Sequence, residues 1–153
     1  MADNDVLLTN QMPHSPQAEQ AVLGSMLIDA DCVKDVMDQL QTQDFYLRTN
    51  RDIFETIYQM FVYSKPIDGV TVAGEMEKNG KSNEQTRSYL VQLMEVTPTS
   101  ANVMEYVRIV QEKSLMRQVA FAAGSITAMV QQGTGSAGDM LEAAEQRIYA
   151  IRR

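Results

Sequence analysis

The chain has 153 residues, of which 44% are hydrophobic, enough for one compact domain with an appendage. Its net charge is −7: residues 1–100 carry 15 acidic and 7 basic side chains, and residues 101–153 carry 5 and 6, so neither part has the basic surface that tight nucleic-acid binding requires. No apolar run approaches the about 18 residues of a membrane span, no signal region is visible, and the single cysteine, Cys32, excludes an internal disulfide. We therefore expect a cytoplasmic protein.

The N-terminal part of the chain predicts a tail followed by helices. Residues 1–12 lack a periodic pattern and are predicted to be a mobile tail, and residues 13–98 are predicted to form a helical head. Ser15 is the expected N-cap of the first helix, with Pro16 at its first position. Asp29 is the expected N-cap of a second helix, in which Cys32 is a small core residue rather than a reactive thiol.

Residues 44–62 are predicted to contribute aromatic and aliphatic side chains to the core. Residues 44–46 are predicted to be a turn that places two aromatic side chains in the core, and Thr49 is the expected N-cap of a third helix. The apolar stripe of that helix is expected to contain Ile53, Phe54, Ile57, Tyr58, Phe61 and Val62.

The stretch "GEMEKNGKS", residues 74–82, ends like a phosphate-binding loop. The Walker A pattern requires its first glycine at position 75, which is Glu75, and no buried strand precedes it. We therefore predict a short helix at residues 71–79, ended by Gly80 in the C′ position. A further helix is predicted at residues 88–96, presenting Tyr89, Leu90, Leu93 and Met94.

The C-terminal part predicts a long helical hairpin, residues 99–153. Residues 101–131 contain no proline, and a continuous helix there would be about 46 Å long. Glycines follow, and Ser136 with Asp139 form a capping-box-like start for a last helix. The expected fold class is all-α: a compact helical head followed by a long antiparallel hairpin.

The hairpin has more apolar surface than two helices can cover for each other. A second hairpin could bury the surplus in a four-helix bundle, although the hairpin could instead fold back on its own head. The predicted hairpin dimer interface consists of Leu115, Val119, Ala122, Ile126, Met129, Leu141 and Ile148.

No pattern of catalytic, cofactor-binding or metal-ligating residues is found in the sequence. The only histidine, His14, cannot make a zinc site by itself. The segment "MLID" resembles a Walker B pattern, but it is predicted to be helical and Asp29 is better explained as an N-cap. We expect no enzymatic activity and no cofactor in this chain.

Five segments carry a family resemblance. "SPQAEQAVLGSMLID", "DFYLRTNRDIF", "PIDGVTV", "PTSANVMEYVRIVQEKSLMR" and "AEQRIYAI" resemble, in order and spacing, the N-terminal domain of the DnaB-type replicative DNA helicases. The resemblance covers about residues 13–151. Two departures stand out: Asn50 replaces a usual histidine, at what we take to be a helix-start position, and "SNEQTRS" replaces a usual Gly-Gly pair before Tyr89.

The resemblance implies a role in assembly and docking. Members of the family are hexameric rings that unwind DNA with ATP and Mg in a C-terminal domain, which would follow a linker starting near Arg153. Their N-terminal domains pair through hairpins into a trimer of dimers, a collar that receives primase. The positions that correspond to the primase surface are Gln17, Tyr89, Ala120 and Ile126.

Two other functions remain open from the sequence. The chain could be a stand-alone helical adaptor that binds a helicase or a primase without any ATPase domain. It could also be a helical DNA-binding module, for which the acidic head predicts only weak and salt-sensitive binding.

Overall fold

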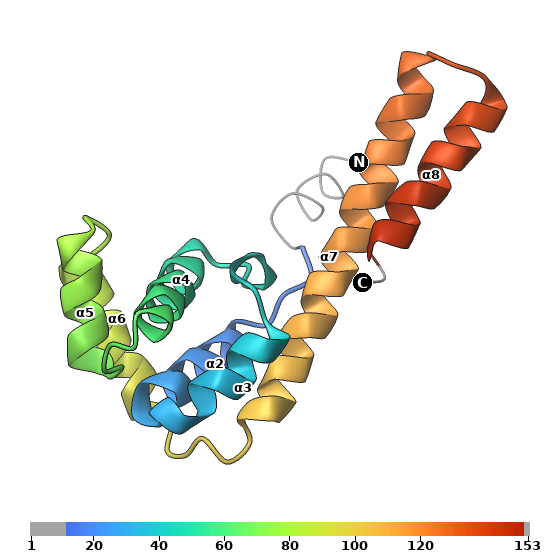
Figure 1. The fold of residues 1–153 in the computed structure, drawn as a ribbon. Coiled ribbons are helices and arrows are strands. Elements are labelled where there is room, and N and C mark those ends of the chain that lie inside the picture. The colour runs from blue at the N-terminus through green and yellow to red at the C-terminus, as the bar shows by residue number, and fades with distance from the viewer. Residues whose placement is uncertain (1–11, 152–153) are drawn as a thin grey trace. The chain divides into compact units, whose positions relative to one another are not determined.

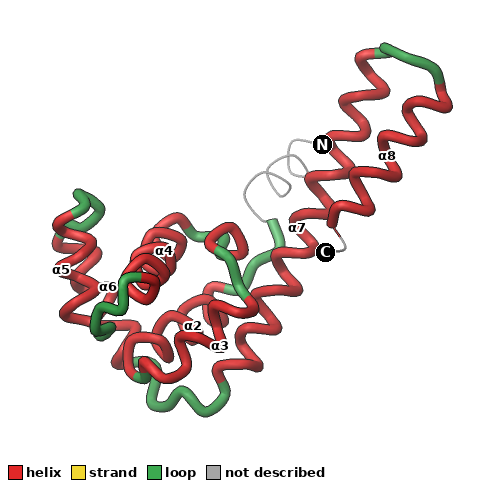
Figure 2. The backbone as a smooth tube through the Cα atoms, in the orientation of Figure 1, coloured by secondary structure: helices red, strands yellow, loops and turns green. Residues whose placement is uncertain are grey.

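The computed structural model describes residues 12–151, and these residues contain helices, turns and loops but no strand (Figures 1 and 2). The all-α prediction is thereby confirmed. The expected tail at residues 1–12, apart from Met12, and the expected start of a linker at residues 152–153 lie outside the described range. The elements are α2 (Pro16–Ile28), η1 (Ala30–Cys32), α3 (Val33–Gln39), η2 (Thr42–Asp44), α4 (Arg48–Val62), α5 (Gly69–Lys78), α6 (Glu84–Glu95), α7 (Val103–Gln132) and α8 (Ala137–Ile151).

The chain divides into two compact units, one of residues His14–Glu112 and one of Met1–Pro13 with Lys113–Arg153. We call residues 14–112 the head and residues 113–151 the hairpin. The division falls inside α7, further along the chain than the predicted boundary at residue 98. The physical reason is that Val103, Val107 and Val110, on the first turns of α7, are buried in the core of the head.

One core holds the head together. Helix α2 contacts α3, α4 and α6, and α5 contacts α4 and α6. At Gly24 of α2 the contact with α6 is close, because a Cβ there would lie 2.7 Å from the carbonyl oxygen of Leu93. The core side chains that are essentially inaccessible to solvent include Val22, Leu23, Met26, Val33, Val36, Phe45, Ile53, Phe54, Ile57, Val72, Met76, Leu90 and Leu93.

The predicted start of the first helix is confirmed. The Ser15 hydroxyl accepts a hydrogen bond from the Ala18 backbone N–H at 3.1 Å, and Pro16 occupies the first helical position. Asp29 caps the 3₁₀ turn η1, where its carboxylate accepts from the Asp31 N–H at 3.0 Å. The same carboxylate accepts from the Ser100 hydroxyl at 2.7 Å, which ties the loop before α7 to the end of α2.

Helix α4 differs from its prediction in two ways. Thr49 is not its N-cap, because the helix begins at Arg48 with Leu47 as the cap residue and without a side-chain cap. Its stripe is also narrower than predicted, since Tyr58, Phe61 and Val62 are exposed. Met60, which the prediction left out, is buried in the core instead.

Helices α5 and α6 both begin earlier than predicted. Asp68 caps α5 in a capping box with Thr71, the residue at which the sequence placed the first turn. Asn83 caps α6 by accepting from the Thr86 N–H at 2.9 Å, five residues before the predicted start at Ser88. Asp68 and Asn83 each accept a hydrogen bond from a free backbone N–H of the first turn. Such a cap sets where a helix begins, and the apolar pattern alone does not show it.

The predicted hairpin is present. Helix α7 runs continuously through Gly124, the chain turns at residues 133–136, and α8 returns antiparallel beside α7 (Figure 1). The turn has the predicted capping pair: the Asp139 N–H donates to the Ser136 hydroxyl at 3.1 Å, and the Ser136 N–H donates to the Asp139 carboxylate at 3.3 Å. Local polar chemistry therefore fixes the point at which the hairpin reverses.

Candidate functional site

Neither a metal-binding cluster nor a reactive cysteine is found among the described residues. Within residues 12–151 no cluster of three or more His, Cys, Asp or Glu side chains could hold a metal ion. Over the same range no helix combines the length and apolarity needed to cross a bilayer. Cys32 is buried, and burial, followed by the nearby Asp29 carboxylate, raises the pKa of its thiol to about 11. A thiol with that pKa is protonated near neutral pH and is a poor nucleophile.

The Gly-Lys-Ser segment at residues 80–82 ends a helix and has no phosphate-loop geometry. Gly80 has a φ of 72° and is the C′ residue of α5, as predicted. Its N–H donates to the Glu77 carbonyl at 3.1 Å, and the Lys81 N–H donates to the Met76 carbonyl at 2.8 Å. This pair of bonds is the Schellman arrangement, which satisfies the last carbonyls of the helix itself.

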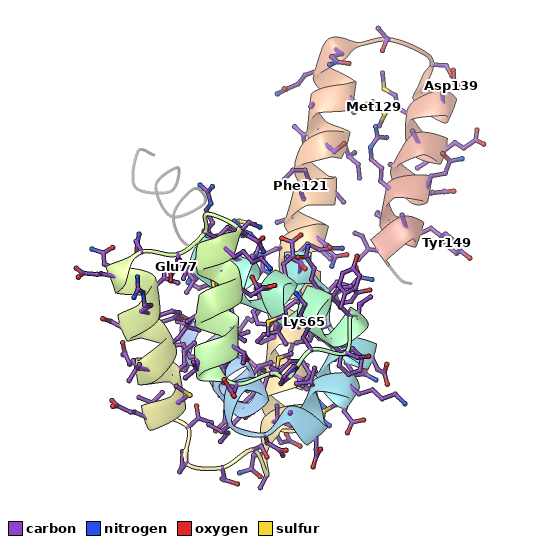
Figure 3. All side chains as sticks on the ribbon, turned by 60° about the vertical axis from the view of Figure 1, so that its left-hand side comes forward. Lys65, Glu77, Phe121, Met129, Asp139 and Tyr149 are labelled. Carbon is purple, nitrogen blue, oxygen red and sulfur yellow. The ribbon has the colours of Figure 1, made fainter. Side chains whose placement is uncertain are left out.

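The inner face of the hairpin is formed by small and flexible side chains. Met129 lies between α7 and α8, and Tyr149 points away from α7 (Figure 3). The Arg147 Nε donates to the Ser125 hydroxyl at 2.9 Å, and one Arg147 Nη lies 3.5 Å from the Met129 sulfur. Among the predicted interface residues, Ala122, Ile126 and Met129 are only partly exposed.

The other predicted interface residues lie on the exposed side of the two helices. Val119 is 54% exposed, Leu141 63% and Ile148 50%. Residues three, four, seven or eleven apart lie on one side of a helix, so each helix presents a row of such positions. We define the apolar row as Leu115, Val119 and Val130 of α7 and Leu141 and Ile148 of α8.

The four positions implied by the family resemblance are distributed over both units. Gln17 is exposed on the first turn of α2 and lines a cavity of about 450 Å³, together with the loop that precedes α7. Tyr89 is half-buried on α6. Ala120 is exposed on α7, whereas Ile126 is partly covered within the hairpin.

A buried polar network binds the hydroxyl of Tyr89. Its hydroxyl donates to the Asn50 Oδ1 at 2.6 Å, and the Asn50 Nδ2 donates to a Glu19 carboxylate oxygen at 2.9 Å. Glu19 is only 1% exposed, and it also accepts from the backbone N–H groups of Tyr46 at 2.8 Å and Leu47 at 3.4 Å. Burial raises the pKa of Tyr89, so its hydroxyl stays protonated as a donor near neutral pH.

The sequence analysis missed this network. It placed Asn50 at a helix start, which is confirmed because Asn50 is the third residue of α4. It did not predict that the side chain is fully buried and joins α2 to α6 through α4. Through the N–H of Leu47, the N-cap residue of α4, Glu19 also ties the start of α4 to α2. The available signal was a glutamate between Ala18 and Val22 on the apolar side of α2, since a carboxylate in that position requires donors.

Comparison with known proteins gives consistent matches. A family model described as "DnaB-like helicase N terminal domain" matches residues 11–112. The replicative DNA helicase DnaB of Leifsonia xyli subsp. xyli is 34% identical over 140 residues, covering 91% of this chain and 31% of that protein. The protein of the same name from Mycobacterium leprae is 33% identical over 147 residues, covering 92% of this chain and 24% of that protein. The chain thus spans about a third or less of these relatives' length.

Two solved structures share the fold. The crystal structure of the N-terminal domain of DnaB helicase from Mycobacterium tuberculosis has a TM-score of 0.83 at 31% identity, covering 92% of this chain and 99% of that one. The N-terminal domain of DnaB helicase from Helicobacter pylori, described with its interactions with primase, has a TM-score of 0.65 at 24% identity, covering 74% and 89%. The second match supports the fold only.

Proposed function

The chain belongs to the DnaB-like helicase N-terminal domain family, and on that premise we propose that it is the assembly and primase-docking domain of a hexameric, ATP-dependent replicative DNA helicase. The ATPase that drives unwinding would lie in the part of the protein that corresponds to the rest of the relatives' length. This chain would contribute contacts, and no chemistry, to DNA replication.

The observation that carries this proposal is the apolar row on the hairpin. A second hairpin that packs on the row would complete a four-helix bundle and remove the row from water. Full burial of a large aliphatic side chain contributes about 1.5–3 kcal/mol, so covering five half-exposed side chains contributes about 1 kcal/mol each. Counted on both copies, that is on the order of 10 kcal/mol before the costs of association.

The pairing would serve as the building unit of a ring. A two-fold pair buries the same patch on both copies, and three pairs related by a three-fold axis would give six subunits. The row residues Leu115, Val119, Leu141 and Ile148 would lie at the interface between the two hairpins. Ala122, Ile126 and Met129 would support it from inside each hairpin.

Sedimentation velocity of residues 1–153 over a dilution series tests the pairing. Val119→Asp combined with Ile148→Asp places two charges in the row and is expected to keep the chain monomeric, while the unmodified chain gains mass with concentration. This pair is preferable to Ile126→Asp, since Ile126 is partly covered within its own hairpin. Gln131→Asp with Gln146→Asp is the matched control, because both residues are exposed on the same helices outside the row.

The pairing proposal fails if the unmodified chain remains monomeric at every concentration. It also fails if the two-charge variant in the row associates as strongly as the control variant. Similar helix content of both variants by circular dichroism would show that the charges have not simply unfolded the hairpin.

Primase docking is the second part of the proposal. The exposed side chains of Gln17 and Ala120 and the half-buried side chain of Tyr89 would contribute contacts, with Ile126 accessible only in part. Titration calorimetry with the helicase-binding domain of the cognate primase is the test. We expect Tyr89→Ala to weaken binding more than Tyr89→Phe, because the hydroxyl is bonded to the buried Asn50 and the contact with a partner would come from the ring of this half-buried side chain. Equal binding by the unmodified chain and all of these variants would remove Tyr89 from the docking surface.

A further inference from the structure

The end of α5 carries an asparagine that is followed by a glycine, and no other asparagine of the sequence has that neighbour. Asn79 and Gly80 are both exposed, and a Cβ built on Gly80 would have no atom within 4 Å. Asparagine is among the thermally labile residues, and a glycine after it leaves the next peptide nitrogen without a shielding side chain. This pair is therefore the position at which the chain is most open to loss of a side-chain amide.

The reaction at such a pair takes place within the chain. The Gly80 nitrogen loses its proton to base in the solvent and attacks the Asn79 Cγ, a C–N bond forms, and the side-chain nitrogen leaves as ammonia. Water then opens the resulting cyclic imide at either of its carbonyl groups, which gives aspartate or isoaspartate. Water is consumed and ammonia is released in equal amounts, and no further reactant is required.

The folded α5 holds the pair in a geometry that does not react. Asn79 is the C-cap residue and has a ψ of 7°, which places the Gly80 nitrogen beside the Asn79 nitrogen and away from the Asn79 Cβ. Closing the imide ring requires a rotation about the Cα–C bond that brings the Gly80 nitrogen to the Cβ side. The Gly80 N–H also donates to the carbonyl of Glu77, which lies in the last turn of α5 (Figure 3), at 3.1 Å. The proton that must leave is therefore held in a hydrogen bond.

Opening of the last turn of α5 would remove both restraints. The Schellman bonds donated by the Gly80 and Lys81 N–H groups fix this end of the helix. The ion pair between Lys81 and Glu55, at 3.6 Å, is exposed and adds little. Helix ends of this kind open at a much lower free energy than the whole domain. The reactive geometry is therefore controlled by the local stability of α5.

We propose that Asn79 is a deamidation site of this chain and that the last turn of α5 sets the rate of the reaction. Both products place a carboxylate at the C-terminal end of a helix, where the helix dipole disfavours negative charge. Isoaspartate also adds a methylene group to the main chain before Gly80, which displaces the Gly80 N–H from the Glu77 carbonyl. Deamidation would thus loosen the end of α5. The inference does not depend on the role in replication.

Two substitutions change the stability of α5 and leave Asn79 and Gly80 in place. Asp68→Ala removes the N-cap bond to the Thr71 N–H, and we expect deamidation at Asn79 to become about five-fold faster. Gly74→Ala adds a side chain that favours the helix at an open position, and we expect the reaction to become about three-fold slower.

The measurement is peptide mapping by mass spectrometry after the full chain has been aged in heavy-oxygen water at mildly alkaline pH. The label marks each aspartate or isoaspartate that formed during ageing. Asn83, which is exposed but followed by Glu84, is the internal control. The chain unfolded in urea gives the rate without the restraint of α5, and we expect the folded chain to react at least about ten-fold more slowly at Asn79.

Equal rates at Asn79 in the folded and the unfolded chain would overturn the control by α5. So would rates that neither Asp68→Ala nor Gly74→Ala changes. Faster loss of the amide from Asn83 than from Asn79 in the unfolded chain would overturn the assignment of the site itself.

Discussion

In the head, apolar side chains from α2 to α6 and from the first turns of α7 meet in one core, whereas α8 of the hairpin contains no buried residue. The head also satisfies its buried polar side chains internally: within the described residues, no buried side-chain nitrogen or oxygen lacks a hydrogen-bond partner. The turn of the hairpin is stabilised by the Ser136–Asp139 capping bonds, but its apolar row remains exposed to water. The comparison suggests that the head folds on its own contacts and that the hairpin gains stability from association.

The largest expected effect comes from replacing Phe54. This substitution tests whether the stability of the head depends only on contacts within one copy. Phe54 is fully buried and its ring lies 4.8 Å from that of Phe45, so Phe54→Ala should lower the free energy of unfolding by about 3–5 kcal/mol. Denaturant unfolding followed by circular dichroism measures the change, and the loss should be the same at low and high protein concentration. Val70→Ala, at an exposed position of α5, is the control, with an expected change within about 0.5 kcal/mol.

Breaking the Glu19–Asn50–Tyr89 network should have a smaller effect on the same region. Asn50→Ala leaves the Tyr89 hydroxyl and one Glu19 oxygen without their buried partner, which should cost about 1–3 kcal/mol. Gln85→Ala, exposed on α6, is the matched control and should be nearly neutral. If Asn50→Ala unfolded at the denaturant concentration of the control, the network would not contribute to the stability of the head.

Two glycines, one inside α5 and one just after its end, give the smallest effects, with opposite signs. Gly80→Ala forces a side chain into a backbone with φ of 72° and should destabilise the head by about 1 kcal/mol. Gly74→Ala, inside the helix where no atom lies within 4 Å of the added Cβ, should stabilise it by about 0.5–1 kcal/mol. Thermal unfolding of the two variants side by side measures both signs, and a stabilising Gly80→Ala would contradict the assigned helix end.

These regions also differ in how much of them the sequence could reveal. Ser15, Gly80 and Ser136 were predicted correctly because each acts on backbone groups within three or four residues. The cap at Thr49 was predicted wrongly, and the burial of Asn50 was missed. The partner of Asn50 is Glu19, about thirty residues earlier in the sequence, and spacing along one segment does not show such a partner.

The hairpin shows a different limit. The sequence shows that the hairpin has a surplus of apolar residues. It does not show which of them are covered within the hairpin and which remain exposed. Ile126 and Met129 are partly covered while Val119 and Leu141 are exposed, and this depends on how α7 and α8 are rotated about their axes. That rotation is set by packing of the two helices against each other, including the fit of Arg147 against Ser125.

Hydrogen exchange in α4 and α8, measured on the same sample across a dilution series, compares the two regions most directly. Our account predicts that the protection of α8 falls as the chain is diluted, and falls to the level of the Val119→Asp and Ile148→Asp variant, because pairing stabilises only the associated state. The protection of α4 should not change. Protection of α8 that is independent of concentration and equal in the variant would contradict the claim that a second copy covers the apolar row.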